Sequence, residues 1–286
     1  MFVFFVLYFL KKDKKENVRG VIALKKNVFA LVSSIAVLGT ALAGCGGGQQ
    51  ASTPAQPANN TTTQQPAATP EAEKKPQVLR LNLHSEPPTA DPGLSEDTTS
   101  AAIIRATFDG LTRIGQDGKP QMAAAEKVEV SEDMLTYKFT IRDAKWSNGE
   151  PVTAKDFEYA WKRALDPATG ANYAYQLYYV KNGEKANKKE AKLDDVGVKA
   201  LDDKTLEVKL ENPTPFFLEL TAFPTYFPVN EKVISANAKW AGEAKTHVGN
   251  GPFKMESWEH KSKLVLVKND NYWDKDTVKL DRIEFS

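Results

Sequence analysis

The sequence predicts a mixed α/β domain of α+β character, in which strands outnumber helices. Leucine alternates with polar residues over 79–84, and the same period of two returns over 135–142, as in strands with one face on a core. Residues 157–165 instead place their apolar side chains on one stripe of a helix. No repeat at a fixed period is visible, which argues against a solenoid.

Composition limits the classes of partner and site. The 286 residues are 41% hydrophobic and 26% charged, which is ordinary for a globular chain. The formal net charge is +1, from 38 basic and 37 acidic residues, so the sequence offers no cationic face for nucleic acid. A single cysteine, Cys45, excludes a disulfide framework and any multi-thiolate metal site.

An apolar run over residues 28–42 follows Lys25 and Lys26 and leads through small residues to Cys45. This order is typical of a signal peptide, so we assign residues 1–44 to targeting. Because the small residues end at a cysteine, the pattern resembles a bacterial lipobox, which implies a diacylglycerol on Cys45. The alternative is a transmembrane helix with a free thiol, but spanning needs about 20 apolar residues. We therefore expect a lipid anchor holding the protein on the extracytoplasmic face of the cell membrane.

Two further segments precede the folded part. Residues 1–10 are apolar but too few to span a bilayer, and we hypothesise that residues 1–23 reflect a mis-assigned start, with translation beginning near Leu24. Residues 46–77 contain no Val, Ile, Leu, Met or aromatic residue and so cannot offset the entropy cost of ordering. Residues 45–77 are therefore expected to be a lipidated cysteine and a disordered tether.

Order is expected to begin at Val78, with the leucine alternation forming the first core strand. Consecutive prolines make residues 86–93 a loop, because proline breaks both ladders and helices. Apolar residues at helical spacing then predict a short helix over about 99–109.

The middle of the chain carries the clearest local signals. Residues 135–142 predict a strand that faces a core on one side, and residues 147–150 predict a turn. Thr153 and Asp156 form a variant of the capping box, so a helix should follow and stop at Asp166-Pro167.

The remaining strands are expected near and beyond the middle. Residues 196–201 and 205–210 flank Asp202-Asp203-Lys204 and predict a hairpin. Residues 263–268 and 278–285 are also strand-like.

Seven motifs follow one another along the chain from about Val78 to its end. They are Phe108 to Leu111, residues 135–142, Trp146 to Phe157, Trp161 to Arg163, Gly197 to Leu210, Asn250 to Phe253 and Asn271 to Trp273. In this order they resemble the family 5 extracellular solute-binding proteins, and residues 161–167 with Tyr173 are most similar to the oligopeptide-binding branch of that family.

The resemblance implies a periplasmic-binding-protein-like bilobal fold that closes over an extended peptide. It divides the chain into a first-lobe core segment at 78–108, an inserted subdomain at 109–230 and a return to the first-lobe core at 231–286. Family members are nearly twice as long, so we expect the chain to represent the first lobe only, with the C-terminal lobe missing. It also implies oligopeptides and ABC-transporter permease subunits as partners.

The resemblance maps the family's peptide-pairing backbone onto Glu96, Asp97 and Thr98, and a cleft tyrosine onto Tyr173. Main-chain pairing suits a transporter that must accept many sequences, because it depends on no particular side chain. The alternatives are a solvated loop with a helix cap for the first three residues and an ordinary surface or core aromatic for Tyr173. Phe223, Asn250 and Tyr272 are interpreted as turn or core residues.

We expect no catalytic, metal or cofactor site. The three histidines lie far apart in the sequence, and no Ser or Cys has a nucleophile-elbow context. Trp146, Phe157 and Trp161 resemble a sugar-stacking platform, but their spacing favours core packing. Two alternatives to a peptide-binding module remain open: a lipid-anchored glycan-active enzyme and a non-functional fragment.

Overall fold

The computed structural model describes residues 75–286, which lie in one compact unit. The signal region 1–44, the lipidation site Cys45 and almost all of the predicted tether 45–77 lie outside the described residues. Among residues 75–286, no helix is both long and apolar enough to cross a bilayer. Gln77, assigned to the tether, already exchanges hydrogen bonds with Asp281.

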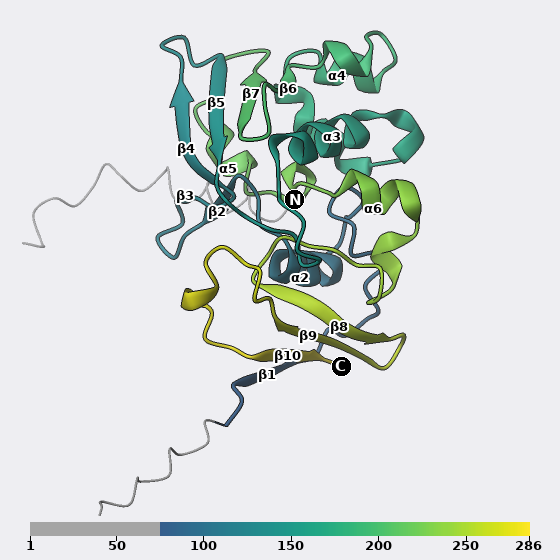
Figure 1. The fold of residues 1–286 in the computed structure, drawn as a ribbon. Coiled ribbons are helices and arrows are strands. Elements are labelled where there is room, and N and C mark those ends of the chain that lie inside the picture. The colour runs from purple at the N-terminus through teal and green to yellow at the C-terminus, as the bar shows by residue number, and fades with distance from the viewer. Residues whose placement is uncertain (1–74) are drawn as a thin grey trace, which may run out of the picture. The chain divides into compact units, whose positions relative to one another are not determined.

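One sheet combines segments from the two ends of the described chain (Figure 1). Its strand order is β1-β10-β9-β8, with β1 parallel to β10 and the other pairs antiparallel. Helix α2 packs beside β8. The strands and helix are β1 (Val78–Leu81), β8 (Phe253–Glu259), β9 (Lys263–Lys268), β10 (Arg282–Phe285) and α2 (Thr98–Thr107).

The prediction of a core strand at β1 is correct for the strand and wrong for the core. Leu79 and Leu81 are 38% and 43% exposed. The reason is position, since β1 is an edge strand that pairs only with β10 among the described residues. The predicted strand over 278–285 is also shorter than expected and begins at Arg282.

A second sheet has the order β4-β5-β7-β6 and is antiparallel throughout. Tyr137, Phe139 and Ile141 of β5 are buried, which confirms the one-sided strand. The predicted hairpin is confirmed as β6 and β7. A two-stranded hairpin, β2 with β3, was not predicted, nor was β4. The bounds are β2 (Thr112–Ile114), β3 (Pro120–Met122), β4 (Ala125–Val130), β5 (Thr136–Ile141), β6 (Val198–Ala200) and β7 (Thr205–Lys209).

Helix α3 (Ala154–Leu165) packs against β6 and β7 with the predicted stripe. The Asp156 carboxylate accepts hydrogen bonds from the backbone N–H of Thr153 at 2.7 Å and from its hydroxyl at 3.0 Å, which confirms the capping box. Trp161 is fully buried and donates through its indole to the backbone oxygen of Tyr226 at 2.8 Å. The helix ends at Asp166, directly before proline, as predicted.

Short helices connect these parts. They are η1 (Pro167–Thr169), η2 (Asn172–Tyr179), α4 (Gly183–Asn187), η3 (Leu193–Asp195), α5 (Phe217–Leu220), η4 (Pro224–Tyr226), α6 (Glu231–Ala236), η5 (Trp240–Gly242) and η6 (Lys275–Thr277). Residues 78–107 and 253–285 thus build the first sheet and its helix, and residues 112–209 build the other two sheets. The domain boundaries after residues 108 and 230 stay a prediction, because residues 75–286 form one compact unit.

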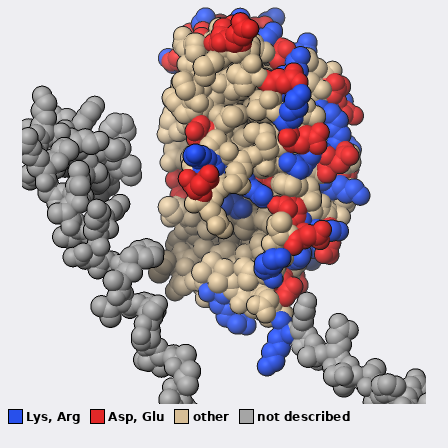
Figure 2. All heavy atoms as spheres, turned by 90° about the vertical axis from the view of Figure 1, so that its left-hand side faces the viewer, with Lys and Arg blue, Asp and Glu red and all other residues tan. Residues whose placement is uncertain are grey.

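Charged side chains are unevenly spread on the face seen in Figure 2. They crowd along the right of that view, where Lys and Arg interleave with Asp and Glu, and they are sparse along its left. This face therefore concentrates no charge of one sign that would attract a polyanion.

Candidate functional site: an extended segment beside an aromatic group

The segment predicted to pair with the peptide, residues 96–98, leads into helix α2. Asp97 is the N-cap residue, with extended backbone angles of −124° and 163°, and its carboxylate accepts from the Ser100 N–H at 2.8 Å. Thr98 is the first helical residue, and both Thr98 and Glu96 are exposed. The cap interpretation of Asp97 is therefore correct, and a role in binding is compatible with it because the cap uses the side chain.

The backbone of this segment keeps free donors. Within residues 75–286, no hydrogen bond joins the N–H of Glu96 or Asp97 to another group. Among the described residues, the Glu96 carbonyl accepts from the Tyr173 hydroxyl alone, at a long 3.5 Å. Exposed, extended backbone with unpaired N–H groups is the geometry that an added strand requires.

Helix η2 brings Tyr173 to this segment across 77 residues of sequence. Its neighbour Asn172 donates from its amide to the Glu96 carboxylate at 2.6 Å. The Tyr173 ring lies 5.7 Å from that of Tyr175 and 5.8 Å from that of Phe223, and Tyr175 is 50% exposed. The structure thus joins all four predicted binding residues in one surface, with an aromatic group beside the extended backbone.

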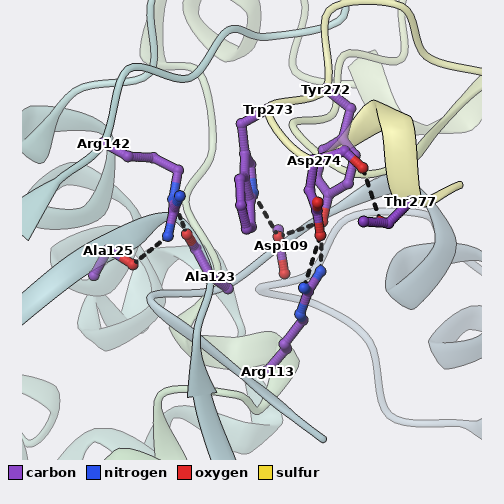
Figure 3. Close-up of polar contacts among 9 residues, drawn as sticks. All are labelled: Asp109, Arg113, Ala123, Ala125, Arg142, Tyr272, Trp273, Asp274 and Thr277. Atoms are coloured by element: carbon purple, nitrogen blue, oxygen red, sulfur yellow. Dashed lines mark hydrogen bonds and ion pairs between the residues drawn. The ribbon is translucent and has the colours of Figure 1, made fainter.

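A buried polar cluster lies where α2 ends (Figure 3). One oxygen of the Asp109 carboxylate accepts from the Tyr272 hydroxyl at 2.8 Å and from the Trp273 indole at 3.1 Å. The Asp109 backbone exchanges two hydrogen bonds of 2.9 Å with the Asn250 amide. Arg113 donates to Tyr272 at 3.0 Å and pairs with Asp274 at 2.8 Å. Asn250 and Tyr272 are therefore buried, hydrogen-bonded residues of this cluster.

Burial sets the electrostatics of the cluster. It raises the pKa of Asp109 to about 6, although hydrogen bonds from Tyr272 and Trp273 and the charges of Arg113 and Arg142 act in the opposite direction. The Arg142 guanidinium lies 3.5 Å from the centre of the Trp273 ring, a cation–π contact, and donates to the backbone oxygens of Ala123 and Ala125.

The cavity beside Asp109 is about 250 Å³, below the usual size of a ligand pocket. Its lining combines Arg105 and Arg113 with apolar side chains such as Phe227. Within residues 75–286, no group of three or more His, Cys, Asp or Glu is arranged to hold a metal ion. We therefore interpret the cluster as a structural feature whose hydrogen bonds fix the chain at the end of α2. The surface at Glu96 and Tyr173 is the candidate site.

Comparison with known proteins supports the sequence resemblance. The sequence pattern of the bacterial extracellular solute-binding proteins, family 5 (middle region), matches residues 119–286, more than half of the chain. The chain belongs to this family. The membership predicted from the motifs is thereby confirmed.

Two similar proteins bear the names of peptide-binding proteins. The chain is 57% identical over 209 residues to the oligopeptide-binding protein OppA of Bacillus subtilis, which covers 72% of this chain and 38% of the relative. It is 51% identical over 210 residues to the dipeptide-binding protein DppE of the same organism, covering 73% of this chain and 39% of DppE. The chain thus spans about two fifths of the length of these relatives.

Solved structures of similar proteins also match about two fifths of their own length. The substrate-binding domain of an oligopeptide ABC transporter from Bacillus anthracis superposes with a TM-score of 0.73 at 48% identity, covering 74% of this chain and 42% of that one. OppA of Listeria monocytogenes, bound to peptide, gives 0.72 at 41% identity, with coverage of 74% and 43%. The mixed α/β fold and its relation to bilobal binding proteins are confirmed.

Sequence reasoning missed the roles of Asp109, Arg113 and Trp273. Asp109 and Trp273 were visible within two of the family motifs, but those motifs are separated by more than 150 residues and nothing local indicates that they meet. Asn172 and Tyr175 were missed as well, although they flank Tyr173. A polar or aromatic neighbour of a predicted binding residue is the signal that would have found them.

Proposed function

We propose that this protein captures extracellular oligopeptides as the lipid-anchored solute-binding component of an ABC importer and delivers them to the permease subunits. Membership of a solute-binding family and the names of the relatives support this proposal. The role is binding and delivery, without catalysis.

The observation that carries the proposal is the exposed Glu96 with the extended backbone of Asp97, whose N–H groups have no partner among the described residues and lie beside the Tyr173 ring. A peptide lying along this segment would pair with it as an added strand. Each such hydrogen bond contributes about 0.5 to 1.5 kcal/mol net and depends on no particular ligand side chain. The aromatic group adds apolar contact area with a polar edge, which suits a permissive site.

The alternative of a glycan-active enzyme loses the feature that suggested it. Trp146, Phe157 and Trp161 are fully buried, so they form core and offer no stacking face to a sugar. Nothing else among residues 75–286 favours that alternative over peptide binding.

Peptide binding can be tested on the chain by amide NMR titration with tetra-alanine. We expect the signals of Glu96, Asp97 and Thr98 to shift with a dissociation constant in the millimolar range, near 4 kcal/mol. The affinity is low because the described residues form one wall of a site: they contact the peptide from one side, through the backbone of residues 96–98 and the Tyr173 ring. Immobilising the ligand meanwhile costs several kcal/mol.

Two tyrosine variants sharpen this test. Tyr173→Ala should weaken binding about fivefold, equivalent to roughly 1 kcal/mol. Tyr179→Ala is the matched control, because Tyr179 lies on the same helix η2 and packs on Phe216 instead. Absence of any shift at the segment would refute peptide binding by this surface and favour a non-functional fragment, whereas micromolar binding would show that one wall suffices.

The lipid anchor is tested separately. Cys45→Ser should abolish incorporation of labelled palmitate and leave the precursor uncleaved. Normal labelling of this variant would contradict the lipobox assignment and would leave the peptide-binding proposal untouched.

A further inference from the structure

A buried ion pair connects helix α3 to the loop ahead of the candidate site. Arg163 donates from its two terminal nitrogens to the two oxygens of Asp91, at 3.2 and 2.8 Å. The side chains are only 15% and 4% exposed. Arg163 belongs to the Trp161-Lys162-Arg163 motif and is not among the predicted binding residues.

Asp91 organises the residues that lead to Glu96. Its carboxylate accepts from the Gly93 N–H at 2.9 Å, and its backbone oxygen accepts from the Leu94 N–H at 3.1 Å. Ser95, the next residue, is buried. At the far end, Asp97 is fixed by its capping bond to α2. Residues 91–97, which we call the binding segment, are therefore held at both ends, with Glu96 exposed between them.

The same stretch of chain that supplies Arg163 also supplies the side wall of the site. Helix η2 follows α3 after η1, and the two helices contact each other. Asn172 of η2 bonds the Glu96 carboxylate at 2.6 Å. Two neighbouring helices therefore contact the binding segment at two points: α3 bonds Asp91, and η2 bonds Glu96.

We propose that Arg163 is a positioning residue for peptide binding: its ion pair with Asp91 holds the turn over residues 92–94 and thereby fixes Glu96 and Asp97 in the place where a ligand pairs with them. The inference rests on the proposed function. A segment set before the ligand arrives has less ordering entropy to lose on binding. The planar guanidinium suits this task because it makes two parallel bonds to one carboxylate, which a lysine ammonium cannot reproduce.

The test compares Arg163→Met with Lys162→Met in the full chain. Lys162 is the neighbouring residue on α3, carries the same charge and pairs with Glu158 and Asp194, away from the binding segment. The first readout is amide hydrogen exchange at Gly93 and Leu94, relative to exchange in strand β5. The second is the tetra-alanine titration of Glu96.

We expect Arg163→Met to accelerate exchange at Gly93 and Leu94 at least tenfold relative to β5 and to weaken tetra-alanine binding. Lys162→Met should change neither. Arg163→Lys, which keeps the charge, should give an intermediate acceleration and carries the test if the methionine variant does not fold. Normalising to β5 separates a local loss of order from a general loss of stability.

The outcomes distinguish the two ideas. Equal exchange ratios in Arg163→Met, Lys162→Met and the unaltered chain would overturn the positioning role, even if tetra-alanine binds. Accelerated exchange with unchanged tetra-alanine affinity would also overturn it, because the segment's order would then not matter to the ligand. If the unaltered chain itself gives no shift with tetra-alanine, the proposed function fails, and the exchange data still report whether Arg163 orders the segment.

Discussion

Replacing Asp109 by asparagine should change how stability depends on pH. Burial raises the pKa of Asp109 from 3.8 to about 6, so between these values the folded chain holds a proton that the unfolded chain has released. The stabilisation of the folded state by the Asp109 proton is fully present below pH 4 and is lost as pH rises through 6. A shift of this size corresponds to on the order of 3 kcal/mol. Asparagine does not titrate and keeps an oxygen that can accept from Tyr272 and Trp273.

The measurement is urea unfolding of both proteins at several pH values from 4 to 7. We expect the unfolding free energy of the unaltered chain, minus that of Asp109→Asn, to fall by about 2.5 kcal/mol over this range. Other groups with shifted pKa values, such as the buried His247 and the half-buried Asp156, are common to both proteins and cancel in the difference. Parallel curves would show that the Asp109 carboxylate is not held in a desolvated site, and the reasoning from burial would be refuted.

Two substitutions test the packing. Trp161→Ala should lower the free energy of unfolding by about 3 to 5 kcal/mol, because it leaves a cavity where a fully buried aromatic side chain was. The control Lys162→Ala should lower it by less than about 1 kcal/mol. Equal losses in denaturant melts would show that the apolar stripe of α3 does not face a core. Gly251→Ala should be as damaging, because a Cβ there would lie 2.5 Å from the backbone nitrogen of Phe108, while Gly242→Ala meets nothing within 4 Å and should melt like the unaltered chain. A stable Gly251→Ala protein would contradict the close approach of the two segments.

Local patterns predicted the elements whose signals are strong over a whole segment. Strand β5 and helix α3 were found because an antiparallel strand with one buried face and a helix with one buried stripe impose periods of two and 3.6. Strand β8 was not predicted, because a bulge between Met255 and Ser257 interrupts the alternation of its apolar and polar residues. At β1 the alternation was real, but a pattern shows that one face is apolar and cannot show what covers it.

The candidate site depends on contacts that no local pattern encodes. The family resemblance located Glu96 and Tyr173 separately, and the fold brings them together. The cluster around Asp109 is similar, because its bonds to Asn250 and Tyr272 connect residues 141 and 163 positions apart. The sequence shows which residues these motifs contain, but the topology of the fold decides which of them come into contact.

The pairing of β1 with β10 has a consequence for the order of folding. Each residue of β1 is matched with one 204 positions later, so this contact closes almost the whole described chain into a loop. The hairpins of the middle sheets join residues much closer in sequence and can form first. Strand β1 buries little leucine surface when it docks, so its attachment gains little and should come late. The edge of the first sheet beside β10 would then stay open to solvent for most of the folding reaction.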